Sequence, residues 1–475
     1  MKKRLAALLL VLALLLTCVP VGVIAEGTDP AQPLAEGQEE TTGEAVVREE
    51  HDHKDDAHKC EHCNQFVDWD EWGDDPAEKT TLPTSGHYYL GDHIKVSATT
   101  DVKDSAELVL CLNGYTIDAQ HTTYIYRVGT NNSTTDKAKV TISDCMAYTD
   151  AAGEYHAGAL MNGKGKDGGG AFFMRGASSL YMYAGKLTGH QNTQTSSSTG
   201  YGGGAITSRN TATIYLKNVE ISGCSTGTEG GAIGSRDQVT ITLEKVTMKN
   251  NTATRAGGAI YLDSANNQLT ATDCVFENNT TAVTGGAVSA RNGEAVLTNC
   301  LLKKNTATTD GGAVYLIGAN SSMTATDCRF EENTSTQRGG AIAMLEGCSA
   351  TVIGGAFHKN SATSLGGAIY TNTSDLTVKG TADTYLPLTE NHGEAGGNGG
   401  AIYMTGDRDV LLQYVSITGN TAATNGGSAL MVTGDAQVKL SDAIVTGNRN
   451  LTTGTFRGAV YVAGKLSALT LSGRV

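Results

Sequence analysis

Cysteine and histidine side chains gather in one short stretch that could bind a metal ion. The stretch contains His51, His53, His58, Cys60, His62 and Cys63. The Cys60-x-x-Cys63 spacing supplies half of a zinc knuckle, and no second cysteine pair follows nearby. We therefore take His58, Cys60, His62 and Cys63 as candidate ligands of a structural zinc ion. A flexible metal-scavenging linker or a Cys60–Cys63 disulfide would explain the same spacing, and nothing nearby suggests a substrate pocket for catalytic zinc.

Tyrosines recur at one position of a repeated pattern in the body of the chain. They are Tyr261, Tyr315, Tyr370, Tyr403 and Tyr461, and Ser289 and Ala343 interrupt them. Each tyrosine follows a β-branched residue that should point inward, so the tyrosines should point outward, often about 10 Å apart. Such a row could stack on sugar rings, which makes Tyr261, Tyr315, Tyr370 and Tyr403 candidate glycan-binding residues. The simpler interpretation is that these rings pack on neighbouring tyrosine and threonine side chains.

Carboxylates that could cleave a polysaccharide are the third candidate feature. A glycosidase needs two carboxylates that flank the scissile bond. The nearest match is Asp273, Asn299 and Asp327, which recur immediately before a column of cysteines. No arginine or lysine recurs in register with them, so a solvated turn is preferred over a calcium or catalytic site. We assign no catalytic residue.

The elements that must position these residues follow an export segment. Residues 1–25 predict a signal peptide, with a basic start, a short apolar stretch and a small-residue cleavage site. Residues 26–50 predict a disordered acidic linker. Residues 51–83 form the module rich in Cys, His and Trp, whose Asp68-Trp69-Asp70-Glu71-Trp72 run could pack on the body. Residues 84–475 form that body.

A repeat dominates the body. Gly-Gly-Ala begins at Gly169, Gly203, Gly230, Gly257, Gly285, Gly311, Gly339, Gly366 and Gly399. The steps from Gly203 to Gly366 are 26 to 28 residues, whereas a propeller blade needs about 40. Each unit contains three short apolar strands and an Asn-Thr-Ala-like turn. We therefore predict an all-β chain that forms a single-stranded right-handed parallel β-helix of about 27 residues per coil. Pro387 should lie in a loop inserted after Gly366.

Each repeated position then acquires a structural role. The β-branched column should face the core; it comprises Ile233, Ile260, Val288, Val314, Ile342, Ile369, Ile402 and Val460. The glycine pair should form one corner, where a side chain would obstruct or where φ is positive. The second corner should hold a structural ladder, Asn251, Asn279, Asn305, Asn333 and Asn360, because asparagine tolerates the left-handed conformation and stacked amides can bond one another.

The remaining cysteines are interpreted as core residues. Cys274, Cys300 and Cys328 share a column with valine, leucine and alanine, so they should behave as small hydrophobic side chains. A disulfide between adjacent coils is the alternative. Cys111, Cys145, Cys224 and Cys348 are isolated in the sequence and are interpreted in the same way.

The paired Gly-Gly-Ala-Ile and Phe-x-x-Asn motifs resemble the repeats of chlamydial polymorphic membrane proteins. They also resemble pectin-lyase-like β-helix surface proteins of gut Firmicutes, over roughly residues 83–475. The resemblance implies the fold and a surface protein or adhesin, but the same fold hosts enzymes as well as inert rods. The chain stops in mid-repeat, so we expect it to be truncated at its C-terminus.

Charge limits the choice of partners. The formal net charge is -14 and no basic stripe follows the signal, so nucleic acid is not an expected partner. We expect a monomer with no transmembrane span in the mature chain, which is secreted and associated with the cell surface. Two functions stay open: a non-catalytic adhesin or glycan-binding rod, and a polysaccharide lyase or glycoside hydrolase.

Overall fold

The structure is a computed structural model that describes residues 62–66, 68–121, 123–195, 202–394, 398–423, 426–451, 458–464 and 467–475. The chain divides into two units, Met1–Glu49 and Glu50–Val475, and all described residues belong to the second. The expected signal peptide and acidic linker, residues 1–50, therefore lie outside the described residues. In the described part, no helix has the length and apolar character that a membrane span requires.

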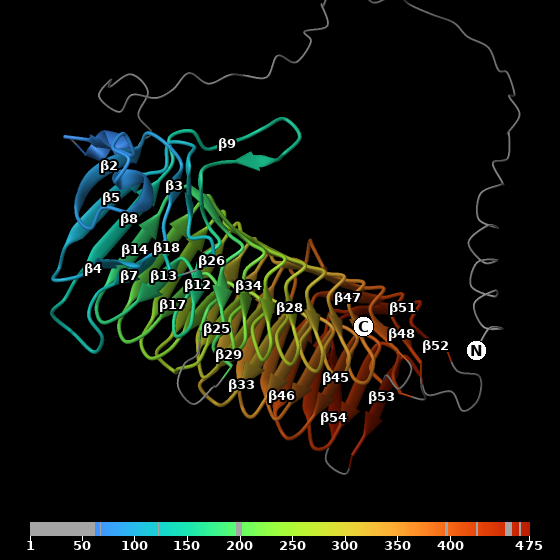
Figure 1. Cartoon of the computed structure of the whole chain (residues 1–475). Coiled ribbons are helices and arrows are strands. Elements are labelled where there is room, and N and C mark those ends of the chain that lie inside the picture. Colours follow the sequence, from blue (N-terminus) through green and yellow to red (C-terminus); the bar gives the residue numbers. More distant parts are fainter. Residues whose placement is uncertain are drawn as a thin grey trace, which may run out of the picture. The chain divides into compact units, whose positions relative to one another are not determined.

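The second unit is a solenoid in which each coil stacks on the one before it (Figure 1). Stacking produces four long sheets: one of 15 strands from β1 (Asp70–Trp72) to β54 (Ala468–Ser472), one of 13 from β3 (Ile94–Lys95) to β51 (Ile444–Thr446), one of 13 from β4 (Thr100–Val102) to β53 (Val460–Ala463), and one of 11 from β12 (Lys164–Gly165) to β52 (Arg449–Asn450). Neighbouring strands in these sheets are parallel, for example Ile260 beside Val288. The predicted right-handed parallel β-helix is confirmed, with about 13 turns of about 28 residues.

One coil shows how the repeat folds. It runs through β25 (Ile260–Leu262), β26 (Gln268–Thr272), β27 (Val275–Glu277) and β28 (Thr280–Thr281). The sequence predicted three strands, and the fourth lies in the Asn-Thr-Ala turn. Its second residue, Thr281, is fully buried while Thr280 is exposed, so even this corner alternates like a strand.

Like side chains stack on like side chains inside the coils. Ile233, Ile260, Val288 and Val314 are direct neighbours from coil to coil, and each is fully buried. Another strand of the coil continues the pattern: the rings of Phe330 in β35 (Arg329–Glu331) and Phe357 in β39 (Ala356–His358) stack 4.7 Å apart. Burial of one such aliphatic or aromatic side chain contributes roughly 1.5–3 kcal/mol, so these ladders are the main stabilising feature of the fold.

Both predicted reasons for the glycine pair apply: one glycine has positive φ, and the other has no space for a side chain. Gly311, the first of its pair, has φ +66°, which L-residues rarely adopt. Gly312, the second, has no such φ, but a Cβ there would lie 2.0 Å from the carbonyl oxygen of Gly340 on the next coil. The corner therefore needs one glycine for its backbone conformation and the other for the close approach of coils.

The explanation offered for the asparagine corner is wrong in one respect. The left-handed residue is not the ladder asparagine but the residue before it: φ is 54° at Asn278, Lys304 and Glu332. The ladder asparagine that follows has ordinary φ and turns its amide into the coil, where it is fully buried. The corner thus tolerates varied residues at the strained position and reserves asparagine for the interior.

Pro387 does not lie in a loop, contrary to the prediction. It is the second residue of β43 (Leu386–Thr389) and pairs with Ser416 of β47 (Val415–Thr418) on the following coil. Toward the preceding coil, the register of β43 includes only Leu388 and Thr389. Proline lacks an N–H, and the interruption falls on the side where that donor would be needed.

The segment before the first full coil covers the solenoid on two sides. β1 extends the 15-stranded sheet by pairing with β2 (Gly86–Leu90), and Trp72 and Leu82 contact the end of the core. Next to it, η1 (Cys63–Gln65) and Trp69 pack on the outer face of β5 (Glu107–Cys111). The Trp69 indole N–H donates to the carbonyl oxygen of Cys63, 3.2 Å away, which fixes this turn.

Candidate functional site

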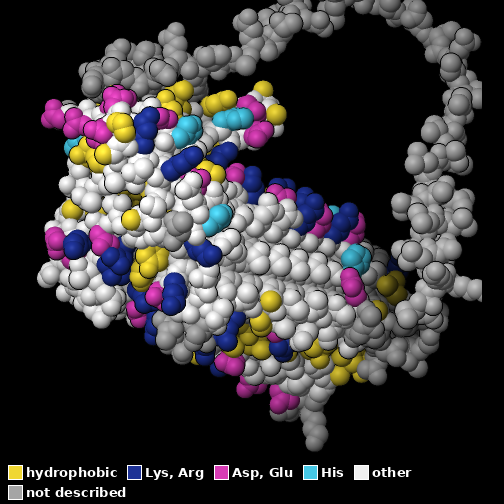
Figure 2. Space-filling view, in the orientation of Figure 1, with side chains coloured by type: hydrophobic (Ala, Val, Ile, Leu, Met, Phe, Trp, Pro, Cys, Tyr) yellow, Lys and Arg dark blue, Asp and Glu magenta, His cyan; other side chains and the backbone are white. Residues whose placement is uncertain are grey.

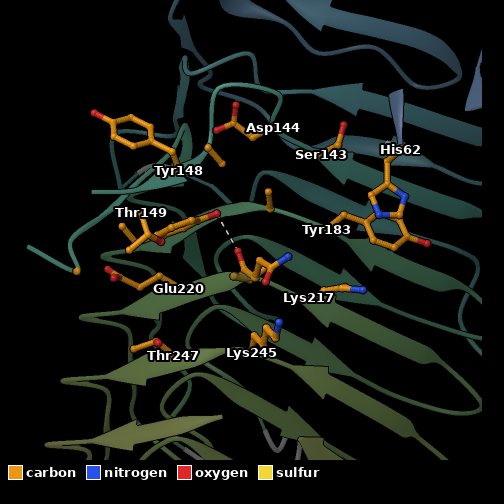
Figure 3. A pocket seen from close by; sticks show the side chains of 16 residues that line it. His62, Ser143, Asp144, Tyr148, Thr149, Tyr183, Lys217, Glu220, Lys245 and Thr247 are labelled. Atoms are coloured by element: carbon orange, nitrogen blue, oxygen red, sulfur yellow. Dashed lines mark hydrogen bonds between the residues drawn. The ribbon is translucent and has the colours of Figure 1, made fainter. Parts of the chain in front are cut away.

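The main departure from the repeat is a hairpin of β9 (Tyr148–Thr149) and β10 (Tyr155–His156), the antiparallel pair among the described strands. It is inserted between two coil strands, β8 (Lys139–Ser143) and β11 (Ala159–Met161), and projects from the body (Figure 1). A groove of about 560 Å³ lies beside it, lined by the hairpin, by Tyr183 and His62, and by the following coils (Figure 3).

Buried polar groups fix the hairpin to the body. Asp144 accepts hydrogen bonds from the backbone N–H groups of Gly114, Met146 and Gly158, at 2.9, 3.0 and 2.5 Å. Burial raises the pKa of this carboxyl despite those donors. The hydroxyl of Tyr155 donates to the carbonyl oxygen of Asn218 at 2.8 Å, and burial raises its pKa to about 12. The groove is therefore preformed.

Aromatic rings stand on both sides of the groove. Tyr148 is 38% exposed and stacks on His156 with ring centroids 4.8 Å apart. Across from it, the half-buried ring of Tyr183 stacks on His62 at 3.3 Å (Figure 3). Aromatic faces of this kind can contact the apolar face of a sugar ring.

Charged side chains line the groove below the aromatic rings. Lys217 and Lys245 occupy successive coils below the rings, with Glu220 beside them (Figure 3). Lys217 forms a 3.5 Å ion pair with Glu244, and Glu220 forms one of 2.8 Å with Lys249. The groove thus offers cationic donors and a carboxylate acceptor to a hydroxylated ligand.

The tyrosine column predicted to bind glycans is mostly covered. Tyr261, Tyr315 and Tyr370 are only 4, 9 and 4% exposed, and Tyr403 is half-buried. Tyr370 lies under the guanidinium of Arg338, 5.0 Å from its carbon, and stacks on Tyr403 at 5.7 Å. Packing on neighbours therefore accounts for most of the surface of these rings.

A second groove, of about 490 Å³, opens where Ser289 interrupts this column between Tyr261 and Tyr315. It contains Glu229, which is 5% exposed and lies 3.6 Å from Arg255. Burial raises the pKa of Glu229 against the effect of Arg255, and its Oε2 has no hydrogen-bond partner among the residues that the structure describes. Glu229 is not among the residues expected from sequence. It immediately precedes a glycine pair, and Asp310 and Arg338 occupy the same position in later coils.

The residues considered for polysaccharide cleavage lie on a sharp turn between two sheets. Asp273, Asn299 and Asp327 have φ of 56, 51 and 52°, and all three are exposed. The Asn299 amide donates to the Asp273 carboxylate at 2.7 Å. Lys245 occupies the same turn position one coil earlier, with φ 53°. Aspartate and asparagine suit this left-handed turn, which explains their recurrence without a ligand.

The cysteines divide into two groups. Cys274, Cys300 and Cys328 are buried free thiols inside the coils, in line with the core interpretation. Cys111 is also buried among apolar side chains, but Cys111 and Cys145 are not isolated in the fold, because both lie with Cys63 in a separate cluster outside the coil core. Of the other proposed zinc ligands, His62 faces Tyr183, and His58 and Cys60 lie outside the described residues, as do His51 and His53.

The comparisons with known proteins agree with the geometry of the coils. The family model described as right handed beta helix region matches residues 130–330, and that of the Chlamydia polymorphic membrane protein repeat matches residues 350–372. The chain is thus similar to pectin-lyase-like β-helix proteins and, over one short segment, to polymorphic-membrane-protein repeats. No curated protein and no solved structure matches the chain significantly.

The repeat of this β-helix protein centres on its asparagines. Each of Asn251, Asn279, Asn305, Asn333 and Asn360 donates from Nδ2 to the Oδ1 of the next ladder asparagine, at 2.9–3.0 Å. Nδ2 also donates to a backbone carbonyl of the preceding coil, as from Asn305 to Phe276 at 2.9 Å. Both polar ends of every amide are engaged, which leaves these side chains no capacity for a ligand.

Proposed function

We propose that this protein is a secreted, surface-associated β-helix that binds glycans as an adhesin, and that the groove beside β9–β10 is its binding site. The observation that carries the proposal is the position of Tyr148 and Tyr183 on opposite sides of a preformed groove, with Lys217 and Lys245 on the coils below them. Stacked aromatic rings bind sugar faces, and the lysines can donate to hydroxyl or carboxylate groups.

Rigid support favours this groove over the tyrosine column. The hairpin is fixed by Asp144 and Tyr155, so a ligand would meet a surface that needs little ordering. The rings of Tyr261 and Tyr370 are almost fully covered by their neighbours, whereas Tyr148 keeps 38% of its surface exposed beside His156. Glycan binding at the column candidates Tyr261, Tyr315, Tyr370 and Tyr403 stays a weaker alternative.

A glycan array with the recombinant chain tests the proposal. Replacing Tyr148 or Tyr183 by Ala should weaken binding of the best glycan about tenfold each, because loss of one stacking contact costs about 1.4 kcal/mol. The matched control is Tyr414→Ala, which removes a half-buried ring paired with Tyr385 elsewhere on the body. Unchanged affinity in both groove variants, measured by titration calorimetry, would refute the site.

Polysaccharide cleavage is a second candidate function, supported by the Glu229 groove. A buried carboxyl whose pKa burial raises, beside Arg255 and Arg291, is the kind of group that could act as a general acid. If the chain is an enzyme, incubation with pectin, alginate or mucin glycans should release reducing or unsaturated ends, and Glu229→Gln should abolish their release. Absence of products from the unaltered chain would rule out cleavage of these substrates.

A further inference from the structure

Three thiols from three different strands or turns converge outside the coil core. Cys63 lies in η1, Cys111 ends β5, and Cys145 follows β8, yet their Sγ atoms all lie within 4.8 Å of one another. Thiolates bound to one tetrahedral zinc ion at about 2.3 Å lie ~3.8 Å apart. The observed cluster is therefore close to the required geometry before any rearrangement.

The surroundings suit a closed structural site. Cys63 and Cys111 are fully buried and Cys145 is half-buried. Trp69, Tyr89 and Val109 complete the cluster, with Phe66 at its edge. A dry shell of this kind excludes water and competing ligands, as at structural rather than catalytic metal sites.

Polar groups of the first coils lie next to the sulfur atoms. The backbone N–H of Cys145 donates to the Sγ of Cys111 at 3.4 Å, and the Cys63 Sγ lies 3.2 Å from the Ser143 hydroxyl. The column of Cys274, Cys300 and Cys328 differs, because it lies among aliphatic side chains inside the coils.

We propose that Cys63, Cys111 and Cys145 bind one structural zinc ion that fastens the segment before β1 to the outer face of the first two coils. Three soft sulfur ligands select zinc over calcium or magnesium, which prefer oxygen. This ligand set differs from the one expected from sequence, because two of its three members come from the β-helix. These thiolates supply three of the four protein ligands that a closed structural zinc site has.

Metal analysis of the full chain, purified without chelators under anaerobic conditions, tests the proposal. Zinc supplied alone should bind at about one ion per chain, and Cys111→Ser and Cys145→Ser should lose it. Cys348→Ser is the matched control, because it removes a buried free thiol far along the solenoid and should keep the zinc. Cobalt in place of zinc should give the intense thiolate-to-metal absorption of a tetrahedral sulfur site, lost in the same two variants.

Thermal unfolding separates loss of metal from loss of fold. A strong zinc chelator should lower the unfolding temperature of the unaltered chain and of Cys348→Ser, and should not shift that of Cys145→Ser. Since Cys145 is half-buried, its serine variant should keep the β-sheet circular dichroism spectrum. Zinc below one ion for every ten chains, or a disulfide joining two of the three cysteines in mass spectrometry, would overturn the proposal.

Discussion

At the scale of single residues, the solenoid depends on amide geometry repeated at one buried position. His190 occupies the ladder position two coils before Asn251 and makes the same kinds of hydrogen bond with a different side chain. Its Nδ1 accepts from the N–H of Gly163 at 3.0 Å and its Nε2 donates to the carbonyl oxygen of Leu160 at 2.9 Å. A neutral imidazole thus replaces the acceptor and the donor of asparagine at a fully buried site.

His190 should make the fold sensitive to acid. Burial lowers its pKa to about 3, against 6.5 in an unfolded chain. Below about pH 6.5 only the unfolded state takes up the proton, so this contribution to stability is complete above that pH and is lost at about 1.4 kcal/mol per unit down to about pH 3. His190→Asn should keep both hydrogen bonds and flatten this slope in urea unfolding measured from pH 7 to 4.

The matched control for that slope is His156→Asn on the hairpin, where the imidazole is half-exposed and pairs with Asp150. The control should retain the dependence of the unaltered chain. An equal slope in His190→Asn and the unaltered chain would mean that other groups dominate the acid response.

At the scale of elements, the corners decide which residues each coil can accept. The strands tolerate exchanges among β-branched and aromatic residues, as in the Ile233, Ile260, Val288 column. The glycine corner does not, because it brings the backbones of adjacent coils together. Coil stacking is thus limited by the glycine corner more than by the strands.

Replacing Gly312 by Ala should therefore disrupt the stack. Its Cβ would meet backbone atoms of Gly340 and Thr334 on the next coil, and neither can move without breaking ladder hydrogen bonds. We expect a loss of several kcal/mol in unfolding free energy, or failure to fold. Gly153→Ala is the comparison: φ is +83° in open space at the hairpin tip, so the cost should stay at about 1–2 kcal/mol.

At the scale of the whole described solenoid, charge is distributed in pairs along the coils. A row of alternating Lys or Arg and Asp or Glu side chains follows one edge of the body (Figure 2). Pairs such as Lys249–Glu220, Lys303–Glu331 and Lys359–Glu390 link successive coils at 2.8, 3.7 and 3.6 Å. These pairs offset like charges across the stack, whereas the aliphatic ladders provide most of the stability.

Salt should consequently have little effect on stability. Exposed ion pairs contribute about 0–1 kcal/mol each and are screened by salt, but burial of the core is not. Raising sodium chloride from about 0.05 to about 0.5 M should change the unfolding free energy by less than about 2 kcal/mol. A larger loss in guanidine-free thermal unfolding would show that inter-coil ion pairs stabilise the solenoid.

The β-helix, its inward Ile and Val columns, its glycine corner and its asparagine positions all follow from the repeat in the amino-acid sequence. The periodicity is sufficient to predict these features, because every coil repeats the same strands and corners and like side chains stack on one another. The tertiary structure alone decided the features that break the repeat. Only folding brings Cys63 to Cys111 and Cys145, or sets Tyr148 opposite Tyr183, since these contacts join residues of unrelated sequence position and no period relates them. The same reason explains why Glu229 was missed: its neighbours in sequence do not reveal that Ser289 leaves a groove in front of it.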